Sequence, residues 1–426
     1  MNKHILILVL FVCVFFCNAQ SPNLNSKNLF SKEQDTVNES LIIKSLKNGY
    51  VPLKYFDLDV KYLLKFNQFE GVRTGLGGVT TEKFSKRFKI LGYGAYGFAD
   101  KRYKFKVGTA FKLNRKDNNW VTLAYTDDIQ ETGSSTFLTD KRFFNLFQPR
   151  QLNVDLFHRY IKKSINLSQQ FYDKFNTEIE LASSNINPTY NYFYRTQGKD
   201  FNTFSLATAK LSIQWSPFSQ FQFINDTLVE TKNGFPKFTI QATQSFESLL
   251  GSDFNFTKLD FRVIHYIKHR NNARTEATIV AGIAEGDIPI THLYHAYPNN
   301  INKETILQRF SIAGLNSFET MFFNEFFSDK FSTLQLKHTF APLNISTKFK
   351  PEFALISRYA VGNMRSKDKH IGINFDTLRH VYSESGFELN KLFYGFGLSF
   401  AYRYGAYYLP KFEDNIAFKF TFNLKL

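Results

Sequence analysis

Few residues in this sequence have the types and spacing that a reactive or ligand-binding site requires. His292 and His295 form an H-x-x-H pair, but a zinc site needs three or four convergent ligands, and no cysteine or acidic cluster stands beside them. We therefore interpret both as solvated loop histidines. Gly75-Leu-Gly77-Gly78 is glycine-rich, but it lies in a strand-like pattern and opens no helix, as a phosphate-binding loop must. Small residues facing a crowded interior or an aromatic neighbour explain it better.

The sequence contains no motif that indicates a catalytic site. Ser, His and Asp all occur, but no nucleophile motif of the G-x-S-x-G type is present. We therefore expect no catalytic residue, no metal and no cofactor.

The first residues predict a secretory signal peptide, 1–19. A basic start precedes an apolar run over 5–17, which is too short to cross a hydrocarbon core of ~30 Å as a helix. Small residues precede a cleavage site between Ala19 and Gln20. Bulky residues precede both cysteines, so lipidation is not expected, and the mature chain has no cysteine left for a disulfide.

Long runs of two-residue alternation dominate the rest of the chain. Segments 102–113, 258–268, 394–404 and 416–426 alternate aromatic or aliphatic residues with small, polar or charged ones, most often Lys, Arg, Gly, Ala, Ser or Thr. Alternate side chains of a strand lie on opposite faces. A membrane strand needs ~9–11 residues, against ~5–6 in soluble sheets. A large soluble β-sandwich is the alternative, but it would need shorter strands and would not explain the signal peptide with an aromatic C-terminal strand.

The sequence therefore predicts an all-β fold: a transmembrane antiparallel up-and-down β-barrel over 55–426, after a short periplasmic segment, 20–54. About 16 strands are expected, an even number as in single-chain bacterial barrels. They are 55–66, 69–79, 87–98, 102–113, 118–127, 160–171, 174–184, 201–215, 237–247, 256–269, 273–284, 330–341, 351–361, 381–390, 393–404 and 415–426.

Connection lengths support this strand count. With both termini periplasmic, tight turns such as Asp173-Lys174 fall at the periplasmic end, and the long segments 128–159, 185–200, 285–329 and 362–380 fall at the outward end. The segment 216–236 is unexpectedly long for a periplasmic turn. We expect 317–328 to be a helix within the longest connection.

That longest connection, 285–329, should fold into the lumen. A loop beyond ~12–15 residues is usually functional or disordered, and its aromatic residues are too apolar to remain in water. Glu319 and Glu325 are acids that could pair with a basic wall. The residues expected in this inward loop include Arg309, Phe310, Leu315, Phe318, Glu319, Met321, Phe322, Phe323, Glu325, Phe326 and Phe327.

The net charge of +16 gives the lumen a second expected property. Basic residues fall on the non-aromatic face of the strands, so we expect them to line the lumen. They either balance acidic loops or create a positive interior that attracts anions. Nucleic acid is not an expected partner. The lumen-facing basic residues are Arg73, Arg102, Lys104, Lys106, Lys112, Lys258, Arg262, Lys268, Arg403, Lys419 and Lys425.

Several segments resemble an uncharacterised outer-membrane family whose members often carry a carboxypeptidase-regulatory-like domain before the barrel. They are NQFEGVRTGLG at 67–77, EKFSKRF at 82–88, GFADKRYKF at 97–105, EFFSDKFSTLQLKHTF at 325–340, YSESGFEL at 382–389, YRYG at 402–405 and FEDN at 412–415. The resemblance covers roughly 50–426. That family's barrel looks like the BamA and surface-antigen class of assembly barrels, with sixteen strands and the longest loop before strand twelve.

The resemblance implies a Gram-negative outer-membrane location, outer-membrane lipid as surroundings, and a role in membrane biogenesis or protein export with periplasmic or outer-membrane assembly partners. The arginine motif of those barrels' long loop is missing, since Arg309-Phe310 is a poor substitute. The alternatives are a channel or porin with a basic, anion-favouring lumen and, as a second alternative, an outer-membrane lipid-modifying enzyme.

Overall fold

The computed structural model describes residues 49–114, 119–142, 149–171, 174–224, 227–301, 311–314, 316–346, 349–393 and 395–422. The chain divides into two units, Met1–Lys44 and Ser45–Leu426, and all of the described residues belong to the second. The expected signal peptide and its cleavage site at Ala19 and Gln20 lie outside the described residues.

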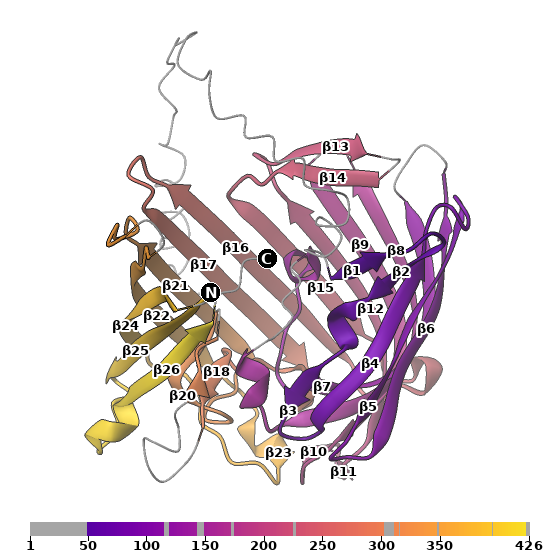
Figure 1. Ribbon diagram of the computed structural model, residues 1–426. Helices are drawn as coiled ribbons and strands as arrows, with labels where there is room; N and C mark the ends of the chain where they lie inside the picture. The colour runs from indigo at the N-terminus through magenta and orange to yellow at the C-terminus, as the bar shows by residue number, and fades with distance from the viewer. Residues whose placement is uncertain are drawn as a thin grey trace. The chain divides into compact units, whose positions relative to one another are not determined.

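One 19-stranded sheet forms the body of this unit (Figure 1). Its strands are β1 (Tyr50–Pro52), β2 (Phe56–Asp59), β3 (Lys65–Asn67), β4 (Gly71–Thr80), β5 (Phe88–Gly97), β6 (Arg102–Lys112), β7 (Trp120–Glu131), β8 (Phe157–Phe171), β9 (Phe175–Pro188), β12 (Phe204–Trp215), β15 (Lys237–Ser245), β16 (Phe256–Lys268), β17 (Arg274–Gly286), β19 (Ser311–Ile312), β21 (Lys330–Thr339), β22 (Glu352–Asn363), β24 (Tyr382–Phe393), β25 (Phe396–Gly405) and β26 (Ile416–Phe422). No helix within the described ranges is long and apolar enough to cross a membrane.

Long strands that follow each other in the chain pair side by side and antiparallel, from β4 through to β26. The first strand is broken into β2 and β3, which both pair with β4 on either side of a 3₁₀ turn, Val60–Tyr62. Leaving aside the short β1 and β19, and counting β2 and β3 as one interrupted strand, the sheet contains the sixteen strands expected from the sequence. The all-β barrel class is therefore confirmed.

The two ends of this sheet carry short additional segments. β1 pairs with β2 at one end, and β19 pairs in parallel with β26 at the other, through Ser311 beside Lys419 and Ile312 beside Phe420. Among the described residues, no ladder joins β26 to β2, β3 or β4. A seam therefore lies between the last strand and the first.

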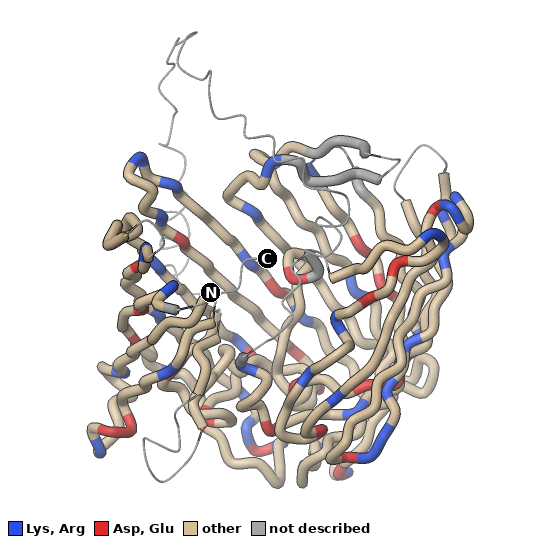
Figure 2. Tube along the Cα trace, in the orientation of Figure 1, with Lys and Arg blue, Asp and Glu red and all other residues tan. Residues whose placement is uncertain are grey.

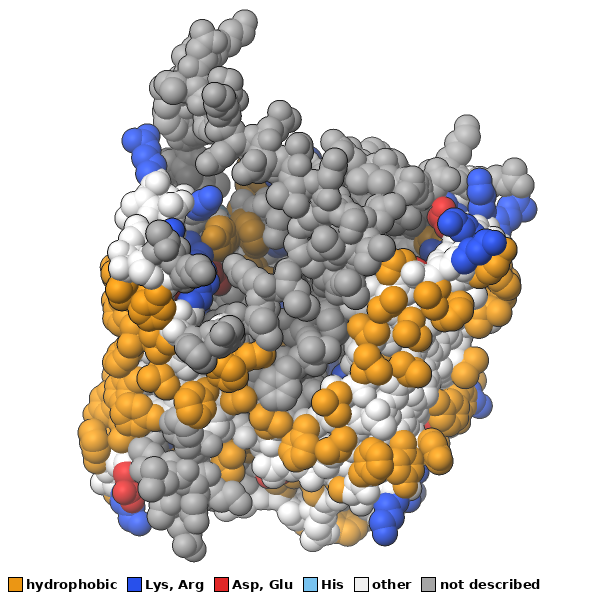
Figure 3. Space-filling view, viewed as in Figure 1, with side chains coloured by type: hydrophobic (Ala, Val, Ile, Leu, Met, Phe, Trp, Pro, Cys, Tyr) orange, Lys and Arg blue, Asp and Glu red, His pale blue; other side chains and the backbone are white. Residues whose placement is uncertain are grey.

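The two faces of the sheet differ in chemistry. Along β25 and β26 the small or charged residues are buried, whereas Phe396, Leu398, Phe418 and Phe420 are exposed. Apolar side chains cover the outside of the strands at both sides of Figure 3. A wall that is apolar outside and polar inside is the pattern of a barrel surrounded by lipid.

The end of the barrel that the connection lengths predict to face outward holds the hydrophobic core. The connection between β17 and β21 contributes β18 (Pro298–Asn300) and β20 (Phe318–Phe322), which pair in parallel. The expectation of a helix over 317–328 is therefore wrong, because pairing with a distant segment overrides local preference. A three-stranded sheet of β10 (Phe193–Thr196), β11 (Lys199–Phe201) and β23 (His370–Ile371) packs nearby. The core cluster joins all of these connections.

One connection at the opposite end was difficult to explain from the sequence. The segment between β12 and β15 contains a hairpin of β13 (Gln220–Ile224) and β14 (Thr227–Lys232). Its length therefore reflects an additional hairpin rather than a missed pair of barrel strands.

Candidate functional site: the charged inner wall and the loop that it holds

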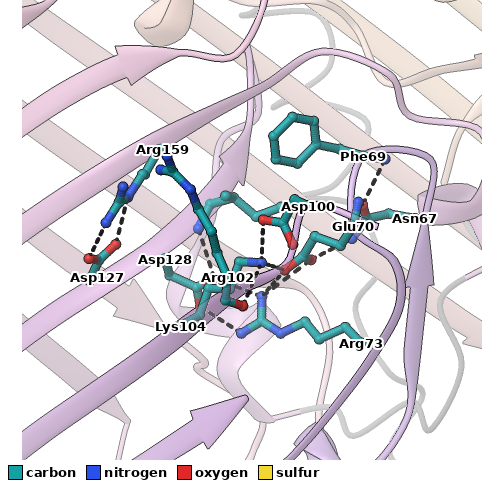
Figure 4. A network of polar contacts seen from close by, with 11 residues as sticks. Asn67, Phe69, Glu70, Arg73, Asp100, Arg102, Lys104, Asp127, Asp128 and Arg159 are labelled. Atoms are coloured by element: carbon teal, nitrogen blue, oxygen red, sulfur yellow. Dashed lines mark hydrogen bonds and ion pairs between the residues drawn. The ribbon is translucent and has the colours of Figure 1, made fainter. Parts of the chain in front are cut away.

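The inner face of β4 to β7 carries a network of buried charges (Figure 4). Arg73 makes a two-pronged contact with Asp128, at 2.7 and 2.9 Å, and lies 3.4 Å from Glu70. Lys104 bridges Glu70 at 2.8 Å and Asp100 at 2.5 Å. All of these partners belong to the wall and its short turns. This part of the barrel therefore neutralises its own charges.

Local backbone geometry places Glu70 in this network. The side chain of Asn67 accepts hydrogen bonds from the amides of Phe69 and Glu70, and its own amide donates to Glu70 Oε2 at 2.6 Å. An asparagine that bonds the backbone two and three residues on makes a tight turn. Gly71 follows with φ of 64°, a left-handed conformation that glycine adopts without strain. The segments 67–77 and 97–105, which carry part of the family resemblance, therefore contact each other in this network.

The inner face of β22 to β26 is organised differently, because its charges hold the inward loop. Glu384 is fully buried and accepts hydrogen bonds from the amides of Glu319 and Thr320, at 3.0 and 2.6 Å, and from the Thr320 hydroxyl. Arg358 pairs with the same carboxylate at 2.6 Å. One wall glutamate thus binds the backbone of β20 and an arginine of β22.

Two further ion pairs connect the loop to this wall. Glu319 lies 3.0 Å from Lys419, and both side chains are only 1% exposed. Glu325 pairs with Arg403 at 2.7 Å. The acids that the sequence offered as partners for a basic wall are the acids that the structure places against it. Burial raises the pKa of Glu325 although Arg403 opposes the shift.

A third cluster joins the loop to the connection after β7. Arg150 donates to Glu131 on β7 and to the carbonyl of Pro298 in the loop. His295 lies 2.7 Å from Glu131, and burial lowers its pKa despite that acid. Sequence reasoning missed Glu131 and Arg150, as it missed Glu384 and Arg358. For Glu384 the available signal was an acid on the lumen side of the predicted strand 381–390, whereas Glu131 lies beyond the predicted strand 118–127.

The loop also fits the wall by shape. Tyr294 lies over Gly282 of β17, where an added Cβ would be 2.5 Å from the ring. Its hydroxyl donates to Asp260 at 2.6 Å, and Lys258 lies 4.4 Å from the ring centroid. A glycine in the middle of a strand is explained by this close approach of an aromatic ring.

The predicted basic residues occupy three environments. Arg73, Lys104, Lys258, Arg262, Arg403 and Lys419 are buried, Lys106 and Lys112 are half-buried, and Arg102 and Lys268 are exposed. Both exposed residues lie at strand ends: Arg102 begins β6 and Lys268 ends β16. Lys425 lies outside the described residues.

The buried cations lie close to acids. Figure 2 shows that basic and acidic residues are interspersed along the strands. Beyond the pairs described above, Arg262 contacts Asp140 at 2.5 Å, and Lys258 is near Asp260 and the Tyr294 ring. Burying a charge without a partner is costly, and the wall avoids that cost.

Within the inward loop, the described apolar residues are packed. Phe318, Met321, Phe326 and Phe327 are at most 3% exposed, and Phe322 and Phe323 are half-buried. Arg309, Phe310 and Leu315 lie outside the described residues.

The histidine pair does not form a metal site. His295 contacts Glu131, whereas His292 bonds Thr291 and packs against the rings of His158 and Phe256. Their interpretation as solvated is wrong, because His295 is 5% exposed and His292 is partly covered. In the part of the chain that the structure describes, no group of three or more His, Cys, Asp or Glu side chains is placed to hold a metal ion.

The glycine-rich segment of β4 contains no phosphate loop. It runs through the strand into a turn, and a Cβ on Gly77 would lie 3.0 Å from the ring of Tyr62. The close aromatic neighbour expected from the sequence is therefore present.

Residues 46–321, more than half of the chain, match the family model described as "Family of unknown function (DUF5686) C-terminal domain". The chain belongs to this family. No curated protein matches the sequence.

Among solved structures, BamA from Haemophilus ducreyi lacking POTRA domains 1–3 is similar at 11% identity and a TM-score of 0.49, over 84% of this chain and 68% of that chain. CdiB from Acinetobacter baumannii is similar at 10% identity and a TM-score of 0.43, over 86% of this chain and 59% of that one. The siderophore receptor PirA from Pseudomonas aeruginosa is similar at 9% identity and a TM-score of 0.32, over 82% of this chain and 65% of that chain.

Proposed function

We propose that this DUF5686 barrel works in outer-membrane biogenesis or protein export in a Gram-negative bacterium, by pairing with an extended client strand at its seam. The observation that carries the proposal is the edge of β26. On one side β26 pairs along its length with β25, and on the other it meets only the short β19 within the described residues. An unpaired strand edge is a template for another strand.

The occupant of that edge is suited to displacement. β19 contributes Ser311 and Ile312 in parallel, and the amide of Ala313 donates to the Phe420 carbonyl at 2.7 Å. This contact is much shorter than the antiparallel ladders elsewhere in the sheet. A longer client strand would gain more backbone hydrogen bonds than β19 loses.

The charge pairing of the wall supports this function over an anion channel. A selective anion pore needs cations that are free to attract the permeating ion. Here Lys104 and Arg73 are held by Glu70, Asp100 and Asp128. We therefore expect low conductance from the intact barrel in planar bilayers. Deleting 300–325 should increase that conductance, and a large anion-selective conductance in the intact protein would favour the channel instead.

A reversible lock on the seam tests the proposal. Ile312→Cys with Phe420→Cys places two thiols on facing residues of β19 and β26. In cells that depend on this protein, the oxidised lock should reduce the amount of newly folded, heat-modifiable outer-membrane proteins, and reduction should restore it. Each single cysteine variant is the control. Normal assembly with a fully formed lock would contradict a role for this edge.

A further inference from the structure

The outer wall of the barrel carries a groove that lies apart from the seam and from the inward loop. It has a volume of about 840 Å³ and crosses the outer faces of β6, β7, β8, β9 and β12. Ligand pockets commonly measure ~300–1,000 Å³. Leu123, Ile165 and Leu181 line it, and each is 43–51% exposed on the outside of the wall.

A rim loop overhangs one side of this groove. Phe246, Leu249 and Leu250 belong to the connection between β15 and β16 and are 41%, 53% and 74% exposed. Ala207 of β12 faces the groove but is only 3% exposed, because this loop covers it. Large apolar side chains held this far out are suited to contact with lipid rather than water.

Hydrogen bonds fix the overhang in place. The amide of Phe246 donates to the Ala207 carbonyl at 3.0 Å, and the amide of Asp253 donates to the Ser205 carbonyl at 2.9 Å. The Asp253 side chain in turn accepts from the Ser205 amide at 2.7 Å. Leu250 has φ of 49°, an uncommon left-handed conformation for a non-glycine residue. Both edges of the overhang are therefore bonded to β12.

Lys163 provides a positive charge at the boundary between the apolar groove and the polar part of the outer wall. Lys163 of β8 lines the groove and is exposed, and no hydrogen bond or ion pair joins its side chain to another residue of the described ranges. Further toward the outward end, Arg159 pairs with Asp127, and Asn185 bonds Ser205. An unpaired lysine on a lipid-facing strand is unfavourable unless an anion meets it.

We propose that this groove binds a phosphate-bearing membrane lipid, with an acyl chain along the apolar floor under the rim loop and the phosphate at Lys163. The apolar lining matches the chain, and the free ammonium matches the headgroup charge. Basic residues at the membrane surface attract anionic lipids in general. The overhanging loop makes this part of the wall a shaped site for one lipid molecule.

Native mass spectrometry of the full-length protein in mild detergent tests this site. The probes are dimyristoyl phosphatidylglycerol and dimyristoyl phosphatidylcholine, which share chains and differ in net charge. Wild type should bind the anionic lipid about tenfold more tightly, because both phosphates can meet Lys163 but the choline cation of phosphatidylcholine is repelled by it. Lys163→Gln should remove the preference, and Ala209→Trp, which fills the groove floor, should weaken binding of both lipids.

Matched variants separate this site from general lipid contact. Lys268→Gln changes an exposed lysine at the end of β16, and Ala277→Trp adds an indole to the outer face of β17. Neither should alter lipid binding, and every variant should still migrate differently before and after boiling. A preference retained in Lys163→Gln, or no preference in wild type, would overturn the proposal.

Discussion

Two regions of the inner wall, β4 to β7 and β22 to β26, satisfy their charges in different ways. On β4 to β7, Arg73 and Lys104 find their acids on neighbouring strands and turns of the wall. On β22 to β26, Arg403 and Lys419 find theirs on the inward loop. The first arrangement stabilises the barrel whether or not the loop is in place. The second keeps its charges paired only while the loop is inside.

This difference indicates which region depends on the loop. If displacement of β19 also separates Glu319 from Lys419, which pairs with Ser311 of β19 as well, two buried charges lose their partners. Uncompensated buried charges then favour return of the loop. On β4 to β7, the Arg73 and Lys104 pairs involve no described loop residue, although Glu131 at the end of β7 contacts His295 of the loop.

The largest effect is expected from Glu384→Ala. The change leaves Arg358 and the two amides of β20 without their acceptor. Removing one partner of a buried ion pair costs about 3–5 kcal/mol. Urea unfolding in lipid vesicles should show this loss, and limited proteolysis should cut the loop. Unchanged stability with a protected loop would show that Glu384 does not hold β20.

Arg73→Met should lower barrel stability with the loop still in place. It leaves Asp128 and Glu70 without the guanidinium, at a cost of about 3 kcal/mol. Limited proteolysis of the loop should nevertheless match wild type, since no loop residue contacts Arg73 in the described structure. Faster loop cleavage in this variant would remove the distinction between β4 to β7 and β22 to β26.

Acid should destabilise the outward connections through His370. Tyr192 accepts a hydrogen bond from the Ile290 amide and lies 2.9 Å from His370 Nδ1, which suits a neutral imidazole. Burial lowers the pKa of His370 to about 4, and Lys369 adds to the shift while Asp368 opposes it. The rings of Tyr194 and Phe375 complete its surroundings.

A folded-state pKa below the unfolded value means that stability is present above pH ~6.5 and is lost as the pH falls toward 4. The full loss is about 3 kcal/mol. Urea unfolding at a series of pH values should show it, and His370→Phe should reduce the slope over that range, with His158, His292 and His295 providing the remainder. An equal slope in the variant would assign the pH dependence to other groups.

A smaller effect is expected from the coupling between Glu319 and Lys419. A double-mutant cycle with Glu319→Gln and Lys419→Gln should give an interaction energy of about 1–3 kcal/mol. The equivalent cycle between Glu319 and Arg73 should give no coupling. Additive losses in the first cycle would mean that the loop is held by its other contacts.

Patterns of period two made most of the fold predictable. The alternation in β6, β16 and β26 reports both the strand and the face that meets lipid, because a barrel wall separates two solvents. The break at Val60–Tyr62 in the first strand was not predictable, since it depends on pairing with β4. The strand β20 was missed because its partner, β18, lies in the same connection and has no alternation.

The site was predictable only in part. Glu319 and Glu325 stood out because an acid beside aromatic residues needs a cation. Glu384 did not, because an acid on the lumen face of a strand has the same local pattern whether water or a loop covers it. The burial of His295 likewise depends on Glu131 and Arg150, which are distant in sequence.

Cross-linking Glu319→Cys to Lys419→Cys tests most directly whether the loop is held against the last strands. The two side chains meet at 3.0 Å, and both native cysteines lie within the first twenty residues of the sequence. In intact cells, a short thiol-reactive cross-linker should join the pair in most molecules, and Glu319→Cys with Arg73→Cys should remain unlinked. Failure of the first pair to link, with rapid labelling of Cys at position 319 by an impermeant reagent added outside, would contradict the account.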